Sequence, residues 1–146
     1  MPAVMRAMRD FSPIMAGGLL ISAFRDALLT ENYVRWLNDP EVVRYSEQRH
    51  RTHTLDSCAN YLADMRASGG LFLSIEVLEP VPWHIGNMSV SLDRPNSSAD
   101  LSIMIGERKA WGSGYATVAW NAVIGYLIRD ANFRRVTAGT MEVNEP

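Results

Sequence analysis

The residues of this chain best suited to chemistry are the twelve from 106 to 117, which read G-E-R-K-A-W-G-S-G-Y-A-T. Glycines at 112 and 114 remove side chains where a backbone has to approach an anion closely. A helix that starts directly after the loop adds unpaired N–H groups and a partial positive charge. Arg108 and Lys109 supply further positive charge. The segment therefore predicts a cradle for a diphosphate, placed between a strand and a helix.

Other designs also use closely spaced glycines. A nucleoside triphosphate loop needs Lys and then Ser or Thr after its last glycine, whereas Tyr115 follows Gly114 here, so that design is excluded. A dinucleotide fingerprint needs a third small residue and an acidic residue about twenty positions on, but Thr117 and Asn132 stand at those places. A dinucleotide site and a plain tight turn remain as alternatives to the diphosphate cradle.

The elements around the loop alternate between strands and helices. Apolar and β-branched runs predict strands at 19–24, 71–78, 84–92, 99–105 and 135–142. Helical spacing predicts helices at 30–37, 55–66 and from 118 to about 130. Asp39 is expected to cap a further short helix that begins at Pro40. The strands before the loop form an antiparallel meander that leads directly into it.

Length and composition limit the classes of protein. A chain of 146 residues suits one domain with a buried core, here expected at 18–146 after a leader at 1–17. Its 14 basic and 16 acidic residues create no broad positive field, so neither nucleic acid nor an anionic membrane is an expected partner. No signal peptide or membrane span stands out. The single cysteine, Cys58, excludes an internal disulfide and a zinc cluster, and we expect it buried in a cytoplasmic protein without a metal.

The loop and its flanks resemble a known family. Residues 109–116, K-A-W-G-S-G-Y-A, are similar to the [QR]-x-x-G-x-[GA] acetyl-coenzyme A motif of the GNAT acyltransferases. The longer W-G-S-G-Y-A-T resembles the branch of that family that acetylates ribosomal proteins. Residues 36–45, 84–86 and 99–106 are similar to that branch's first helical segment, third strand and fourth strand. The resemblance covers roughly residues 19–146 in the expected order.

The resemblance implies a fold and a cosubstrate. The fold class is α/β (α+β), with a mixed central sheet that is mostly antiparallel. Helices cover both faces of the sheet, and the family's last strands are missing. Acetyl-coenzyme A (acetyl-CoA) would be the cosubstrate. Its pantetheine arm would pair with the main chain of Ile103, Met104 and Ile105. Its diphosphate would meet main-chain N–H groups, which are those of Gly112, Ser113, Gly114, Tyr115 and Ala116.

Two further positions follow from the same resemblance. Lys109 stands where the family has Gln or Arg, which keeps the positive charge but loses the planar geometry. Asn144 matches the Asn of a Val-x-x-Asn stretch beside the cofactor. The family's Tyr acid lies on a helix beyond Pro146, so we expect a C-terminally truncated domain whose exposed fifth strand favours association, such as a homodimer.

Acyl transfer to an amine requires a group that takes the amine's proton. Asp100 aligns with a Glu that serves as the base in some family members, and His84 lies on a strand beside Gly86. A solvated strand-end carboxylate and a structural histidine are the alternative interpretations of these two residues. Glu107 is expected at the surface. The two tryptophans Trp111 and Trp120 are expected in the core, with a place beside the cofactor as the alternative for Trp111.

The segment from 44 to 54 would set the choice of acceptor in this family. Its polar and basic side chains suit a polar or anionic acceptor, and the candidates are Tyr45, Gln48, Arg49 and His53. A solvated loop is the alternative. The resemblance thus implies an N-acetyltransferase that acts by direct attack on a small-molecule amine, such as an amino sugar, or on a protein N-terminus. A catalytically impaired acyl-CoA-binding or interaction module is the alternative function.

Overall fold

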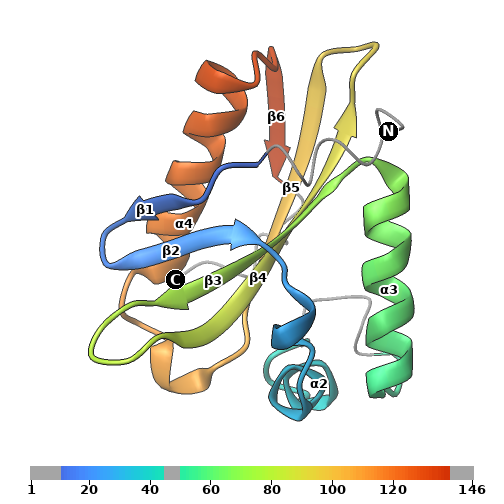
Figure 1. The fold of residues 1–146 in the computed structure, drawn as a ribbon, viewed down its shortest axis with the longest axis vertical. Coiled ribbons are helices and arrows are strands. Elements are labelled where there is room, and N and C mark those ends of the chain that lie inside the picture. Colours follow the sequence, from blue (N-terminus) through green and yellow to red (C-terminus); the bar gives the residue numbers. More distant parts are fainter. Residues whose placement is uncertain (1–10, 45–49, 139–146) are drawn as a thin grey trace.

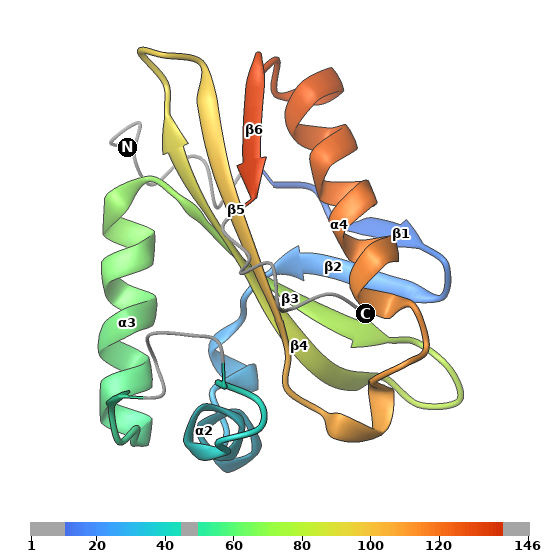
Figure 2. The same cartoon turned by 180° about the vertical axis from the view of Figure 1, so that it is seen from behind.

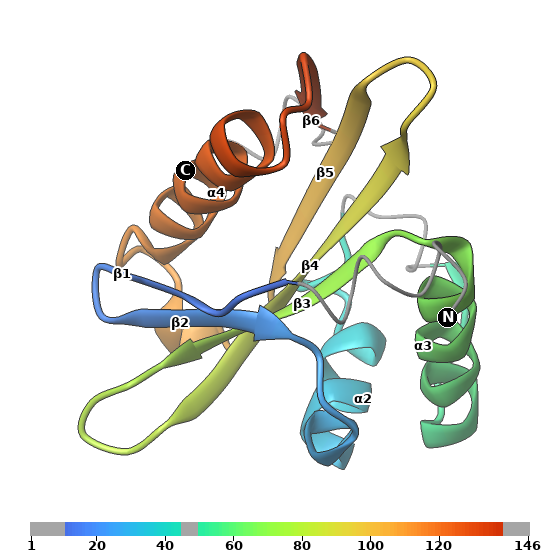
Figure 3. The same cartoon turned by 45° about the horizontal axis from the view of Figure 1, so that its top comes forward.

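The chain folds around one six-stranded sheet, shown from three sides in Figures 1, 2 and 3. The computed structural model describes residues 11–44 and 50–138. The strands are β1 (Ile14–Ala16), β2 (Leu19–Ala23), β3 (Leu71–Val77), β4 (Trp83–Asp93), β5 (Ser98–Ile105) and β6 (Arg135–Ala138). They lie in sequence order, antiparallel from β1 to β5, with β6 parallel to β5. The predicted mixed, mostly antiparallel sheet is confirmed.

The helices lie on both sides of this sheet. They are α2 (Glu31–Asn38), α3 (Leu55–Ser68) and α4 (Tyr115–Gly125), which continues as the π-helical turn η4 (Tyr126–Asp130). Short 3-10 turns are η1 (Asp26–Leu28) and η3 (Arg108–Ala110). Figures 1 and 3 show α4 on one side of the sheet, and α2 and α3 on the other. No helix in the described part of the chain is long and apolar enough to cross a membrane.

The N-terminal boundary of the fold differs from the expected leader at residues 1–17. Phe11 is buried in the core, and Ile14–Ala16 form strand β1, which pairs with β2. The pair Gly17-Gly18, which spans the expected boundary between the leader and the domain, is the turn of this hairpin, with φ of +54° and +81°. The glycines allow a tight reversal between two paired strands. In the structure the sheet therefore begins before residue 18.

Local side-chain caps explain where two of the helices begin. Thr30 accepts a hydrogen bond from the Tyr33 N–H at the start of α2. Thr54 and Ser57 form a reciprocal capping box at the start of α3. The expected further helix at Pro40 is wrong for the described residues up to 44, which form only a turn on the Asp39 carbonyl.

One continuous core joins α4 to the sheet. Ala119, Val123 and Leu127 recur at helical spacing, are fully buried and belong to the same cluster as Leu101 of β5. On the other side of the sheet, aromatic rings fill the space beneath α2 and α3, where Phe72 of β3 contacts Tyr61, Tyr33 and Phe24. Cys58 of α3 is buried, as predicted. This packing fixes α4, and with it the loop before α4, against the end of β5.

Candidate functional site

Strands β5 and β6 pair at only one end within the described residues. The pairs run from Ser98 with Arg135 to Leu101 with Ala138. Ile103, Met104 and Ile105 lie beyond the last described pair, and their side chains are half-buried. Figures 1 and 2 show this end of β5 running toward the start of α4. Among the described residues, none of β6 pairs with Ile103, Met104 or Ile105.

The glycine loop lies between the end of β5 and helix α4. Gly112 and Gly114 have φ of +80° and +79°, in the left-handed region that favours glycine. A Cβ placed on either glycine would meet no heavy atom within 4 Å, so the space above the loop is open. Gly114 is the N-cap of α4 and has no side chain with which to cap the helix. The first N–H groups of α4, at Tyr115 and Ala116, are thus directed to an exposed cradle suited to an anion.

Two side chains flank this cradle. Lys109 is exposed on η3, where its ammonium can add charge. Trp111 is 44 % exposed, so its expected core position is wrong, whereas Trp120 is half-buried against the core. The indole N–H of Trp111 donates to the Ile105 carbonyl at 2.9 Å. That hydrogen bond ties the loop to the last residue of β5.

A group of contacts that sequence reasoning missed joins α2 to the start of the loop. The Trp36 indole N–H donates to Glu107 at 3.0 Å, and Arg108 pairs with Asp39 through two hydrogen bonds, one of 2.9 Å. The Glu107 side chain is only 16 % exposed, so its expected surface position is wrong. Trp36 lies on a helix that is distant in sequence from Glu107, so local sequence patterns could not predict this hydrogen bond.

The two candidate bases lie in different surroundings. Asp100 is exposed near the start of β5 and accepts a hydrogen bond from the Thr137 hydroxyl at 2.7 Å. The His84 ring packs against Trp36, with 4.7 Å between ring centroids, and its Nε2 lies 2.8 Å from Asn87 Oδ1. Burial lowers the pKa of His84, so the ring is neutral at pH 7. Asp100 is thus the more accessible of the two groups.

The expected acceptor residues lie largely outside the described part of the chain. Tyr45, Gln48 and Arg49 fall outside it, as does the predicted cofactor residue Asn144. His53 lies inside it, and its main chain exchanges two hydrogen bonds with the Asn38 side chain, at 2.8 and 2.9 Å.

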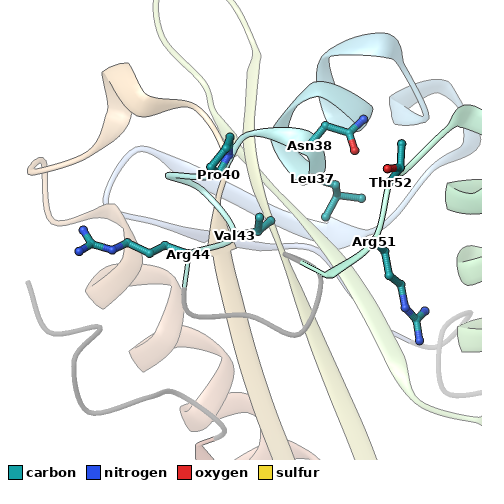
Figure 4. A pocket seen from close by; sticks show the side chains of 7 residues that line it. All are labelled: Leu37, Asn38, Pro40, Val43, Arg44, Arg51 and Thr52. Carbon is teal, nitrogen blue, oxygen red and sulfur yellow. The ribbon is translucent and has the colours of Figure 1, made fainter.

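A pocket next to this segment is lined by apolar Leu37, Pro40 and Val43 together with Arg44 and Arg51. Figure 4 shows the side chains of Arg44 and Arg51 extending in opposite directions, away from the apolar residues. They do not converge on one point as an anion clamp would. Within the described residues, no three His, Cys, Asp or Glu side chains come together to hold a metal ion.

Comparison with known families decides what this loop and sheet belong to. A sequence model of the acetyltransferase (GNAT) domain matches residues 19–146. The chain belongs to the GNAT acetyltransferase family. Proteins of this family transfer acyl groups from acyl-coenzyme A. No curated protein matches the chain in sequence.

Solved structures agree with the GNAT fold. A GNAT acetyltransferase from Bacillus anthracis superposes with a TM-score of 0.75 at 19 % identity, covering 91 % of this chain and 76 % of that one. A spermidine N-acetyltransferase from Vibrio cholerae, in complex with CoA and spermine, gives 0.70 at 17 % identity and covers 83 % and 70 %. The ribosomal-protein-S5-alanine acetyltransferase from Vibrio fischeri gives 0.68 at 15 % identity and covers 92 % and 77 %. At these identities the likeness shows the fold.

Proposed function

We propose that this GNAT protein is an N-acetyltransferase that transfers the acetyl group of acetyl-CoA to a primary amine. The acceptor would be a small molecule, such as a polyamine or an amino sugar, or a protein N-terminus. The observation that carries the proposal is the open glycine cradle at the uncapped start of α4, a short distance in sequence after the end of β5. The cradle would hold the diphosphate of acetyl-CoA, and the end of β5 would hold its pantetheine arm.

The residues present fit this ligand. Backbone N–H groups at the start of α4 match a diphosphate, because an uncapped helix N-terminus carries a partial positive charge. Lys109 is exposed beside them and supplies a full charge in place of the family's planar side chain. The main chain of Ile103, Met104 and Ile105 would pair with the amide groups of the pantetheine arm. Acetyl-CoA, when bound, supplies the activated acyl group.

The state of the one cysteine supports direct attack by the amine. Cys58 is 2 % exposed, and burial raises the pKa of its thiol, so it is unsuited to carry an acyl group. In the proposed step the amine nitrogen bonds to the acyl carbon and the C–S bond breaks. The proton of the amine passes to a base or to the departing thiolate. Asp100, exposed on β5, is the base we propose, and His84 is the alternative.

A polar acceptor suits the side of the sheet that carries α2 and α3. Ser89 and Ser102 hydrogen-bond across β4 and β5 at 2.9 Å, and Asn87 lies in the same row opposite Met104. The Asn87 Nδ2 is buried and meets no hydrogen-bond partner among the described residues. Two of the similar solved structures are named as acetyltransferases of spermidine and of ribosomal-protein-S5 alanine. They support an amine acceptor but do not distinguish a small molecule from a protein N-terminus.

Binding is tested by thermal unfolding with and without acetyl-CoA. At about 100 times Kd, the wild type should gain about 5 °C or more in Tm. Gly112→Asp should abolish the gain, because a carboxylate enters the anion cradle. Gly112→Asn has the same shape without the charge and tolerates a positive φ, so it should keep part of the gain.

A matched control lies outside the loop. Gly18 has φ of +81° and equally open space, so Gly18→Asp carries the same strain and charge in the β1–β2 turn. It should lower Tm yet keep the full gain from acetyl-CoA. The absence of a gain in the wild type would sink the proposed cofactor site. A full gain in Gly112→Asp would place the cofactor elsewhere, and protection by NADH instead would restore the dinucleotide alternative.

Turnover is tested by release of free thiol from acetyl-CoA with a panel of amines. Spermidine, an amino sugar, free amino acids and a peptide with N-terminal alanine represent the acceptor classes. Direct attack predicts sequential kinetics, whereas an acyl-enzyme would give ping-pong kinetics. Binding of acetyl-CoA with no thiol release across the panel would identify the protein as a binding module.

A further inference from the structure

The segment between β5 and the glycine loop is held in place by helix α2. The ring of Trp36 lies against Gly106 so closely that a Cβ at 106 would come within 2.0 Å of it. The indole N–H of the same tryptophan donates to Glu107 at 3.0 Å. Arg35 lies 3.9 Å from the same carboxylate. One face of α2 therefore contacts both of the first two residues after β5.

Strand β4 holds this segment from its other side. The N–H groups of Gly106 and Glu107 both donate to the Ile85 carbonyl, at 2.7 and 3.1 Å. Residue 106 can only be glycine here, because any side chain would collide with the Trp36 ring. The segment is thus fixed between α2 and β4 before the chain enters η3 and the glycine loop.

An ion pair between Arg108 and Asp39 also holds this segment. Arg108 donates from Nε to Asp39 Oδ2 at 2.9 Å and from a terminal nitrogen to Oδ1, in a two-pronged arrangement. Asp39 Oδ1 also accepts from the Glu41 N–H at 3.0 Å. The hydrogen bond from Arg108 lowers the pKa of Asp39, so the pair stays ionised at neutral pH. In this arrangement the guanidinium of Arg108 is committed to a carboxylate and not to a ligand phosphate.

We propose that Trp36 and Asp39 are positioning residues for the cofactor loop, acting through residues 106–108 without touching the ligand. This inference rests on the proposed acetyl-CoA site. A cradle of backbone N–H groups binds an anion well only when those groups are held in a fixed arrangement. Because α2 also leads into the segment expected to contact the acceptor, the same helix joins the two sides of the site.

The first test compares two Asp→Asn variants by calorimetric titration with coenzyme A. Asp39→Asn weakens the contact with Arg108, and its expected effect is a Kd raised about threefold or more. The matched control is Asp26→Asn, which breaks the 2.9 Å ion pair with Arg66 on α3, away from the loop. It should leave the Kd of the wild type unchanged. Trp36→Phe keeps an aromatic ring against Gly106 but loses the N–H, and should also raise Kd.

A double-mutant cycle separates positioning from direct phosphate contact. If Asp39 acts through Arg108, then Arg108→Gln and Asp39→Asn weaken binding to a similar extent, and the double variant is no worse than either. If Arg108 is a phosphate ligand, Asp39→Asn frees its guanidinium and keeps or tightens binding. That result would overturn the proposal.

Two further measurements distinguish positioning from a general loss of stability. Asp39→Asn should raise KM for acetyl-CoA while kcat and KM for the amine stay near the wild-type values. Trypsin should cleave after Arg108 or Lys109 faster in Asp39→Asn than in Asp26→Asn, because the segment is released. The cleavage assay needs no ligand, so it tests the hold on the segment independently of the proposed function.

The outcomes separate the two claims. A wild type that binds no coenzyme A would remove the proposed function and the positioning role together. A wild type that binds coenzyme A, with an unchanged Kd in both Asp39→Asn and Trp36→Phe, would overturn the positioning role alone.

Discussion

His84 illustrates how surroundings decide the chemistry of a single residue. On a strand beside a glycine it is a candidate base, but the fold packs its ring against Trp36 and Phe24, with centroids 4.7 and 5.9 Å away. Burial is the main reason that its pKa is lowered. The ring is therefore neutral, as a base must be, yet its Nε2 already faces the Asn87 amide oxygen.

The lowered pKa of His84 predicts a pH dependence of stability. Below about pH 6.5 the unfolded chain binds a proton at this residue before the folded protein does, so the free energy of unfolding falls as pH falls. His84→Gln should flatten this loss between about pH 7 and pH 5.5, measured as the change in urea midpoint for each protein. His50→Gln, at an exposed position, should keep the wild-type dependence. An equal pH dependence in His84→Gln and the wild type would contradict the assignment.

At the scale of single elements, the helices divide by how they begin. Helices α2 and α3 start at threonines whose hydroxyl oxygens accept a hydrogen bond from the first turn. Helix α4 starts at Gly114, in a left-handed conformation and without a side chain. The first N–H groups of a helix have no partner within the helix; a threonine side chain accepts from one of them in α2 and in α3, whereas no side chain caps α4. That difference supports the proposal that the start of α4 binds the anion.

The capping box of α3 is a separate stabilising element. Thr54→Ala removes the hydroxyl that accepts from the Ser57 N–H at 3.1 Å, and should lower the free energy of unfolding by about 1 kcal/mol. Thr54→Ser keeps the hydroxyl and should lose much less. Urea denaturation of the three proteins measures the difference, and an unchanged midpoint in Thr54→Ala would show that the box contributes nothing.

At the scale of the whole molecule, α4 connects the two ends of the site. Its buried residues pack into the core while its N-terminus forms the cradle, and the chain then returns through η4 to β6 beside β5. Within the described residues, β6 pairs with β5 from Ser98 to Leu101. The position of the cradle therefore depends on how α4 packs into the core.

Two neighbouring residues test how much that packing contributes. Leu127 is fully buried and Ile128 is 48 % exposed. Leu127→Ala should destabilise the fold by about 2–5 kcal/mol, because it leaves a cavity between η4 and the sheet. Ile128→Ala should change stability by no more than about 0.5 kcal/mol. Similar urea midpoints for the two variants would contradict the packing described here.

Much of the fold follows from local patterns. The strands at 71–78, 84–92 and 99–105 and the helices at 30–37 and 55–66 were predicted within two residues of β3, β4, β5, α2 and α3. The period of apolar residues and the threonine caps act between residues close in sequence, so the sequence displays them. The leader was misplaced because a glycine pair ends a segment or turns a hairpin equally well. The helix expected after Asp39 is a turn in the described residues, where the Asp39 carboxylate accepts from the Glu41 N–H and from Arg108.

The sequence alone determined the order of strands β2 to β6 and of helices α2 to α4, the glycine loop and the resemblance to the GNAT family. Only the tertiary structure decided that Trp111 is exposed, that Glu107 is largely enclosed and that α2 holds the loop. The contact of Trp36 with Glu107 spans 71 residues of sequence, and that of Asp39 with Arg108 spans 69. Such contacts form only when the packing of the whole sheet and its helices brings distant segments together, so no local period or cap reports them.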